Sequence, residues 1–272
     1  MTQNFDLHVH TNFCDGKDSP EEVVRAAISL GLKRLGFSAH SYTFFDESYC
    51  IAKDRVEEYR RTIDALGKKY ASDIDILCGI EQDFYSREST ASWDYVIGSV
   101  HYILVKDEYI PVDESAEILK KAAEKYFDGD FYALAEAYFE TVSRVPELTR
   151  VDVIGHFDLI AKFNDRERLF DETEKRYLLA AEKCLKKLAL SGLPLEINTG
   201  AISRGYKSVP YPAPRFWREA SSLGIPFLLS SDSHSADTLA FEFDIWERKA
   251  EKAGLKLLRE LPVKALLSKE RI

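Results

Sequence analysis

The stretch Phe5-Asp-Leu-His-Val-His-Thr-Asn-Phe-Cys-Asp-Gly-Lys-Asp-Ser-Pro-Glu-Glu-Val-Val24 contains the first predicted strand and the first predicted helix start. Residues 5–10 predict a short strand. Ser19 precedes a proline and two glutamates. This pattern is typical of a helix start, because serine can accept from a free backbone N–H and proline fits the first helical turn. The stretch therefore predicts a strand followed by a helix.

The same alternation continues along the chain. Further strands are predicted at 35–38, 74–81, 95–101, 151–156, 195–198 and 226–231, and helices at 19–30, 54–70, 114–125, 131–145, 172–191, 213–223 and 238–253. Strands that alternate with helices form parallel βα units. About seven strands in one chain favour a TIM-like barrel over an open sheet. We expect an α/β barrel with residues 1–272 in a single domain, since about 250 residues often form one barrel.

Composition narrows the function classes. The chain has 272 residues, 45% of them hydrophobic, and a formal net charge of -9, so it can bury a large core but is not expected to bind long nucleic acid. A small anionic substrate remains compatible with this charge if bound divalent ions supply positive charge locally. No apolar run is long enough for a transmembrane helix. Four cysteines without a Cys-x-x-Cys pair, and no recognisable signal peptide, predict a cytoplasmic protein.

All six histidines lie in short segments typical of metal ligands. They are His8 and His10 in 6–11, His40 in 37–40, His101 in 98–101, His156 in 155–158 and His234 in 231–234. Neutral imidazole is the commonest protein ligand for transition metals. Together with Asp15, Glu81 and Asp232 they are enough for more than one ion. The leading interpretation is a multinuclear metal hydrolase.

Almost all of these candidate ligands follow predicted strands, at the ends that converge on the active face of a barrel. His8 and His10 are two residues apart, so both side chains point to the same side of a strand and can bind one ion. Asp232 and His234 have the same spacing. Glu81 ends a run that should be buried, where a carboxylate is costly unless it is paired or ligates a metal. A glutamate there can bridge two ions.

Plainer interpretations of the same residues stay open. His8 and His10 can line a barrel without a metal. Asp15-Gly16 can be an ordinary turn, and Glu81 can be a buried ion-pair partner. Single histidines after strands are more often hydrogen-bonded structural residues, which applies to His40, His101 and His156. Their occurrence together favours the metal interpretation.

Other residues are candidates for supporting roles. Asp6 and Asp158 lie two residues from motif histidines and can orient them by accepting an imidazole N–H, or can serve as caps or ion-pair partners. Arg204 is a candidate bidentate phosphate clamp, with Lys162 and Lys207 as weaker ones. Candidates for substrate contact by position alone are Glu196, Asn198, Gln82, Asp83 and Tyr102. Cys14 is interpreted as a bystander rather than a ligand.

In this order the motifs resemble those of the PHP (polymerase and histidinol phosphatase) family. The resemblance covers almost the whole chain and rests on 6–16, His40, 79–81, 99–101, 155–156 and 231–234. The strings 41–46, 98–103, 155–160 and 196–200 look like those of stand-alone histidinol-phosphatases. The resemblance implies a distorted (β/α)7 barrel with a trinuclear centre. By analogy, His8, His10, Glu81 and Asp232 would hold one ion. Glu81 would bridge to a second ion bound by His101 and His156, and Asp15, His40 and His234 would hold a third.

The sequence departs from the family pattern at two places. Many members have histidine where this chain has Asp15, although others carry the Asp-Gly form. A carboxylate ligand there is expected to weaken the third site or to change its metal preference. The basic residue expected just after the fifth motif is displaced, because position 161 is alanine and Lys162 follows it.

The resemblance implies hydrolysis of L-histidinol phosphate in histidine biosynthesis by a metal-bridged hydroxide. Two to three divalent ions are expected, and the mixed nitrogen and oxygen ligands suit Zn, Mn or Fe. Arg204 would neutralise phosphoryl oxygens, and His234 or Asp232 would help to protonate the leaving alkoxide. One alternative is a PHP-family phosphoesterase acting on a nucleotide or an oligonucleotide 3′ end. The other is a non-catalytic metal-binding module. The sequence predicts no oligomeric state.

Overall fold

Seven parallel strands form one sheet in the computed structural model, which describes residues 3–148 and 150–261. The strands, in sheet order, are β1 (Phe5–Asp6), β2 (Arg34–His40), β3 (Asp75–Asp83), β4 (Val96–Ser99), β7 (Val153–Ile154), β8 (Leu195–Asn198) and β9 (Phe227–Ser230). The sheet follows chain order, as expected when each strand is joined to the next by a right-handed helical crossover. All seven predicted strands are present.

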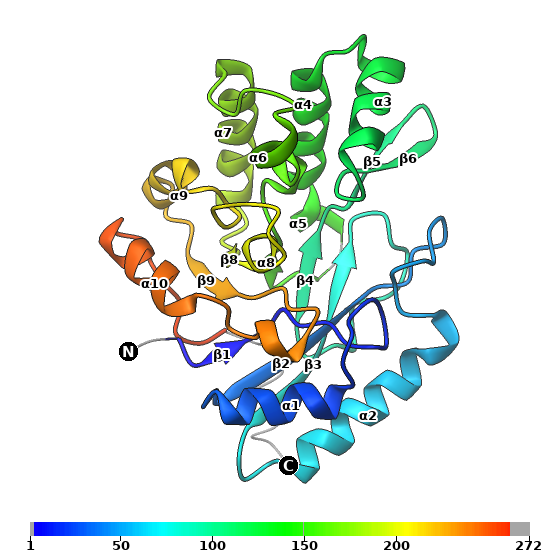
Figure 1. Ribbon diagram of the computed structural model, residues 1–272, viewed down its shortest axis with the longest axis vertical. Coiled ribbons are helices and arrows are strands. Elements are labelled where there is room, and N and C mark those ends of the chain that lie inside the picture. The colour runs from blue at the N-terminus through cyan, green and yellow to red at the C-terminus, as the bar shows by residue number, and fades with distance from the viewer. Residues whose placement is uncertain (1–2, 149, 262–272) are drawn as a thin grey trace.

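The sheet curls until its two edge strands meet beyond their ends. The backbone of His10 donates to Ser233 O at 2.8 Å, and Ser233 N donates to His8 O at 3.1 Å. A parallel bridge joins Val9 to Ser233 at the same place. β1 is therefore shorter than the predicted strand over 5–10, because His8 and His10 bond to Ser233 while Val9 O accepts from Ser38 N of β2, which interrupts the regular ladder. The predicted distorted barrel is confirmed (Figure 1).

Helices surround the barrel (Figure 1). They are α1 (Pro20–Ser29), α2 (Val56–Lys69), α3 (Ala116–Phe127), α4 (Phe131–Val142), α5 (Val145–Leu148), α6 (Asn164–Glu167), α7 (Lys175–Ala189), α8 (Gly200–Ser203), α9 (Trp217–Ser222) and α10 (Phe243–Lys252). The predicted start of α1 is confirmed, since Ser19 and Glu22 form a reciprocal capping box. No helix in the described ranges has the length and apolar character needed to cross a membrane.

An antiparallel hairpin, which was not predicted from the sequence, is formed by β5 (Tyr102–Val105) and β6 (Glu108–Pro111). Its turn residues Lys106 and Asp107 both have positive φ, at 48° and 67°. Two-residue hairpin turns of this kind usually contain glycine or asparagine, and Lys-Asp gives no such signal. The hairpin follows His101 directly and forms one side of the cavity described below.

The barrel interior is apolar toward the amino ends of the strands and polar toward their carboxyl ends. Leu7, Leu77, Tyr95, Ile97 and Leu228 belong to one buried cluster at its base. Side chains alternate along a regular strand, so positions two and four residues after Leu77 point to the same side of the sheet as Leu77. On β3 this places Glu81 four residues above Leu77. The polar ligands thus form the upper layer of the same barrel core.

Candidate metal centre

The nine candidate ligands converge at the carboxyl ends of the strands. They come from the extension of β1 (His8 and His10), its following loop (Asp15), β2 (His40), β3 (Glu81), the residues after β4 and β7 (His101 and His156) and the loop after β9 (Asp232 and His234). Among the described residues, three overlapping groups bring potential ligand atoms within 4.8 Å of one another. Residues spread over most of the chain therefore form one site.

The first group contains His8, His10 and Asp232, and Glu81 of the second group lies beside it. Nε2 of His8 lies 3.1 Å from Glu81 Oε2 and 3.5 Å from Asp232 Oδ1. Nε2 of His10 lies 3.5 Å and 3.2 Å from the same two oxygens. Two ligand atoms about 2.1 Å from one tetrahedral ion are about 3.4 Å apart. The four imidazole–carboxylate separations are close to this value.

Glu81 connects this group to a second one. Its other oxygen, Oε1, lies 2.9 Å from His156 Nε2 and 3.4 Å from His101 Nε2. One carboxylate thus presents a different oxygen to each pair of imidazoles, as the bridging role requires. His40 also reaches it, with Nδ1 at 2.9 Å from Oε2.

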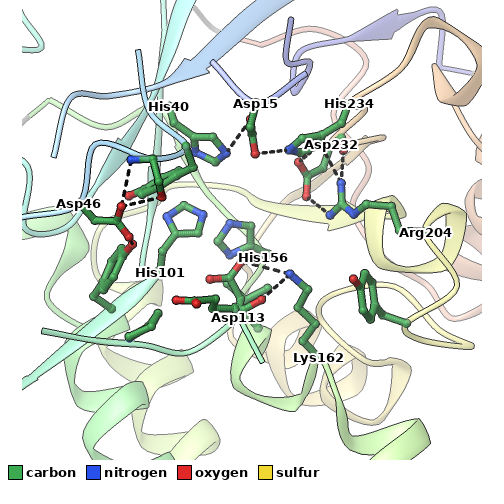
Figure 2. A pocket seen from close by; sticks show the side chains of 17 residues that line it. Asp15, His40, Asp46, His101, Asp113, His156, Lys162, Arg204, Asp232 and His234 are labelled. Atoms are coloured by element: carbon green, nitrogen blue, oxygen red, sulfur yellow. Dashed lines mark hydrogen bonds and ion pairs between the residues drawn. The ribbon is translucent and has the colours of Figure 1, made fainter. Parts of the chain in front are cut away.

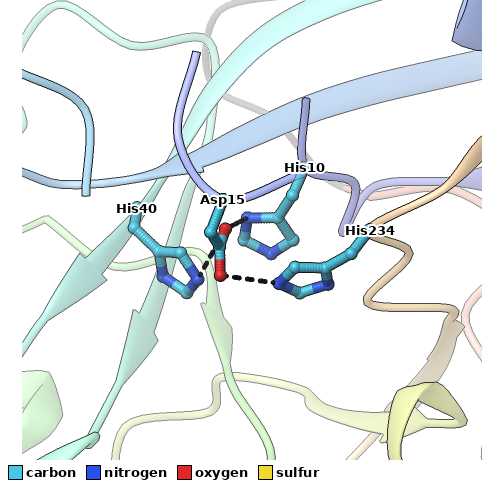
Figure 3. A group of neighbouring side chains, drawn as sticks. All are labelled: His10, Asp15, His40 and His234. Atoms are coloured by element: carbon cyan, nitrogen blue, oxygen red, sulfur yellow. Dashed lines mark hydrogen bonds and ion pairs between the residues drawn. The ribbon is translucent and has the colours of Figure 1, made fainter. Parts of the chain in front are cut away.

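Asp15 is the centre of the third group, drawn in Figure 3. Its Oδ2 lies 3.2 Å from His234 Nε2, and its Oδ1 lies 3.6 Å from His40 Nε2. His10 joins this group, because its Nδ1 lies 3.9 Å from Asp15 Oδ1 and its ring stacks on those of His40 and His234. The loop therefore folds Asp15 back over the site. His10 and His40 each lie between two groups, so the three ligand sets overlap more than the family resemblance implies.

The donor atoms fit a metal because several lack any other partner. Nε2 of His8 and His10, Nδ1 of His40 and Oε2 of Glu81 are buried and form no hydrogen bond. Buried polar atoms without partners are rare and costly unless an ion or water satisfies them. Here they face one another with the spacing of a coordination shell.

The protonation states of the residues in the centre also favour metal binding. Burial opposes ionisation of Glu81, but His8 and His40 hold its pKa well below the ordinary value. Burial, together with His234 and His40, lowers the pKa of His10 to about 3, which leaves its imidazole neutral and able to ligate. Burial also opposes protonation of His8, yet Glu196 and Glu81 raise its pKa well above the ordinary value. A centre this negative is one that divalent cations would neutralise.

Two carboxylates orient metal-ligand histidines by contacting the ring nitrogen that faces away from the proposed ions. Glu196 Oε2 lies 2.8 Å from His8 Nδ1, and its Oε1 accepts from the backbone of His156 at 2.6 Å. Asp83 Oδ2 lies 3.3 Å from His101 Nδ1. Such partners fix the ring orientation of a metal-binding histidine. Glu196 and Asp83 had instead been predicted from the sequence to contact the substrate.

Other supporting predictions need correction. Glu196 and Asn198 are completely buried and do not line the cavity, so they lie behind the ligands and not against a substrate. Asp6 does not accept from an imidazole; its carboxylate accepts from the backbone N–H groups of Ser231 and Ala240. Asp158 likewise accepts from the backbone N–H of Ala213.

Lys207 is also unavailable as a phosphate clamp. Its ammonium pairs with Asp165 and Glu172, and the side chain is 2% exposed. Gln82 lies outside the main cavity, whereas Tyr102 lines it.

A cavity of about 280 Å³ opens onto the centre. Arg204 and Lys162 both line it, as predicted for phosphate-binding groups (Figure 2). Arg204 Nη2 donates to Asp232 Oδ2 at 3.0 Å, and Nη1 donates to the Asp232 backbone oxygen at 2.8 Å. Lys162 Nζ donates to the backbone oxygen of Asp113 at 2.7 Å. Both cations are thus fixed beside the ligand cluster.

The acidic and aromatic side of this cavity was not predicted from the sequence. Asp46, Tyr49, Asp113, Glu114 and Tyr206 line it without having been singled out. Asp113 and Glu114 follow the unpredicted hairpin, so their position could not be inferred. Asp46 ends the string 41–46, and the resemblance of that string to histidinol-phosphatases was the one signal that could have indicated its position.

The fold and this nine-residue cluster agree with a family match. A family model described as "PHP domain" matches residues 6–200, and the chain belongs to the PHP domain family. The predicted family resemblance is therefore confirmed.

Individual relatives are similar along nearly their full length. The chain is 30% identical over 258 residues to a Deinococcus radiodurans protein named "Probable histidinol-phosphatase", covering 89% of this chain and 91% of the relative. It is 25% identical over 266 residues to the "Histidinol-phosphatase" of Bacillus subtilis, covering 89% and 97%. A histidinol phosphate phosphatase structure from Lactococcus lactis, complexed with zinc, L-histidinol and phosphate, aligns with a TM-score of 0.73 at 24% identity, covering 94% of this chain and 95% of that one. This last likeness supports the barrel fold.

Proposed function

We propose that the protein is a metal-dependent phosphomonoesterase that hydrolyses L-histidinol phosphate to L-histidinol and phosphate. The observation that carries the proposal is the cluster of eight potential ligands, joined by His156 through Glu81, beside a cavity with two fixed cations, Arg204 and Lys162. The names of the full-length relatives support histidinol phosphate as the substrate. On this proposal the reaction belongs to histidine biosynthesis, and cytoplasmic location stays a prediction.

Two to three divalent transition-metal ions, Zn, Mn or Fe, would occupy the centre. His8, His10, Glu81 and Asp232 would hold the first. Glu81 would bridge to a second at His101 and His156, and Asp15, His40 and His234 would hold a third. When bound, such ions lower the pKa of a shared water toward neutrality and so supply the hydroxide nucleophile predicted from the sequence.

Arg204 and Lys162 would bind the phosphoryl group. The Asp232 contacts hold the Arg204 guanidinium in one orientation, and its remaining N–H donors can pair with phosphoryl oxygens. Lys162 is held by Asp113 and offers a further ammonium proton to the same cavity. Cations fixed before the reaction stabilise developing negative charge without reorganising.

The leaving alkoxide needs a proton, and Asp232 is a poor source. Although burial opposes its ionisation, Arg204 and His8 hold the pKa of Asp232 well below the ordinary value, so it is a carboxylate at neutral pH. His234 lines the cavity, but its Nδ1 accepts from Arg204 Nη1 at 2.8 Å, so only its Nε2, 3.2 Å from Asp15 Oδ2, could carry the proton. It can serve only while the donating nitrogen is not a metal ligand.

Phosphate release from L-histidinol phosphate tests this function. We expect turnover by Zn- or Mn-loaded protein, loss after treatment with a chelator, and recovery when the metal is returned. Absence of phosphate release from protein that carries two to three ions per chain would reject the proposal. About one tightly held ion per chain without activity would favour the non-catalytic metal-binding alternative.

A further inference from the structure

Asp46 lies on the loop between β2 and α2 and lines the cavity. Figure 2 shows Asp46 and Arg204 on opposite sides of the histidine rings. The cavity therefore has a basic side, suited to phosphate, and a side that carries a carboxylate. The proposed hydrolysis uses the first side and gives no role to the second.

Three hydrogen bonds hold the Asp46 carboxylate in place. Oδ1 accepts from Ser48 N at 3.0 Å and from Ser48 Oγ at 2.6 Å, and Oδ2 accepts from Tyr102 Oη at 2.7 Å. Partial burial opposes ionisation, but the hydrogen bonds from Ser48 and Tyr102 lower the pKa of Asp46. The group is therefore a fixed carboxylate at neutral pH.

No cationic side chain in the described part of the chain forms an ion pair with Asp46. Two other carboxylates of the cavity differ: Asp113 pairs with Lys162 at 3.2 Å, and Asp232 pairs with Arg204 at 3.0 Å. A fixed, unneutralised carboxylate would repel a phosphate ester that carried only negative charge. Its presence beside a phosphate-binding wall suits a substrate with a positive charge at its other end.

We infer that Asp46 accepts a hydrogen bond from the ammonium group of the substrate and selects phosphate monoesters that carry a protonated amine. This inference rests on the proposed function, since L-histidinol phosphate carries such an amine. Tyr49 and Tyr102 also line the cavity, with ring centroids 6.1 Å apart, and offer aromatic faces to a cation or a heterocycle. Asp46 is thus a specificity-determining residue that binds the part of the substrate remote from phosphorus.

A purely structural role makes a different prediction. Asp46 would then only join its loop to the hairpin through Tyr102, and its replacement would disturb every substrate equally. Asp46→Asn separates the two roles, because asparagine keeps the size and one acceptor oxygen but removes the charge. Glu47→Gln is the matched control: Glu47 is the next residue, is exposed, contacts Tyr42 and does not line the cavity.

The experiment measures kcat/KM for three esters with each metal-loaded protein: L-histidinol phosphate, O-phosphoethanolamine and ethyl phosphate, which carries no cation. For Asp46→Asn we expect the ratio of histidinol phosphate to ethyl phosphate to fall about 10- to 100-fold, mainly through KM, as for a partly buried charge pair. The Ki of L-histidinol relative to that of inorganic phosphate should rise by a similar factor. Glu47→Gln should leave both ratios unchanged.

The inference is overturned if Asp46→Asn lowers activity on all three esters by one factor, or changes none of them. It is also overturned if the wild-type protein shows no preference for esters that carry an ammonium group. Failure of the proposed function looks different. The wild type would then leave histidinol phosphate intact yet prefer O-phosphoethanolamine over ethyl phosphate, with that preference lost in Asp46→Asn.

Discussion

Glu196 Oε2 lies 2.8 Å from Nδ1 of His8, where both side chains are completely excluded from solvent. The other oxygen of Glu196 accepts from the backbone N–H of His156. One carboxylate on β8 therefore positions ligands that follow β1 and β7. Nε2 of His8 is left pointing at Glu81 and Asp232.

Replacing Glu196 with glutamine should weaken metal binding without removing any ligand. The amide keeps the size but loses the charge that holds the imidazole, and losses of about 10- to 100-fold in metal affinity follow from such changes. Activity measured during a metal titration should therefore need more metal and partly recover in excess. Glu117→Gln, at an exposed position of α3, is the control. An unchanged titration curve would show that Glu196 does not orient His8.

Glu81→Gln should have a larger effect, because Glu81 presents one oxygen to each of two ligand groups. We expect the metal content, measured by elemental analysis, to fall by at least one ion per chain and activity to fall by about 10³-fold or more. Circular dichroism should report an intact fold. Full activity with unchanged metal content would contradict the bridging assignment.

Arg204→Lys should lower kcat/KM for the phosphate ester by about 100-fold, since lysine keeps the charge but loses the guanidinium fork. Steady-state kinetics at equal metal content measures this effect. Arg248→Lys on α10 keeps an exposed ion pair and is the control. If activity fell only as far as metal content fell, Arg204 would be acting through Asp232 and not on the substrate.

Gly79→Ala should destabilise the barrel by about 1–3 kcal/mol through overpacking. A Cβ at Gly79 would overlap the ring of Tyr95, whose hydroxyl donates to Leu7 O at 2.6 Å inside the barrel. Gly67→Ala in α2 has room, with the nearest atoms at 3.9 Å, and should stabilise by about 0.4–1 kcal/mol. Urea unfolding measures both. Equal effects of the two changes would contradict the packing account.

Asp158 should make stability depend on pH. Burial raises its pKa to about 7, against 3.8 for the ordinary side chain, so between these values the folded state holds the proton more tightly than the unfolded one. Its contribution is therefore full at low pH and is lost as pH rises toward 7, by about 1.4 kcal/mol per pH unit.

Asp158→Asn should remove this dependence. The free energy of unfolding is measured for the metal-saturated wild type and variant at pH 5 and pH 7.5. The value for the variant, relative to that for the wild type, should increase as pH rises. A constant difference would show that Asp158 keeps an ordinary pKa in the folded protein.

Local signals predicted much of this molecule. The capping pattern at Ser19 located α1, and strand-helix alternation gave all seven strands. The ligand cluster followed because barrel strands bring their carboxyl ends together. The hairpin after His101 could not be predicted, because Lys106 and Asp107 adopt positive φ without glycine. Because Asp113 follows this hairpin, its position in the cavity could not be predicted either.

The misassigned polar residues share another cause. Side chains alternate along β8, so Glu196 and Asn198 point into the barrel, but the sequence does not tell how deep in the interior they lie. The ammonium group of Lys207 does not reach the cavity, because it forms ion pairs with Asp165 and Glu172. Both facts depend on contacts between residues far apart in the chain.

The most direct test of the account is the ratio of kcat/KM for L-histidinol phosphate to that for a mononucleotide and for a generic phosphate monoester, measured on Mn- and Zn-loaded protein. The account predicts a preference for histidinol phosphate of several hundredfold or more. Equal activity on all three substrates, or a preference for the nucleotide, would contradict it and move the protein to the alternative nucleotide-cleaving function.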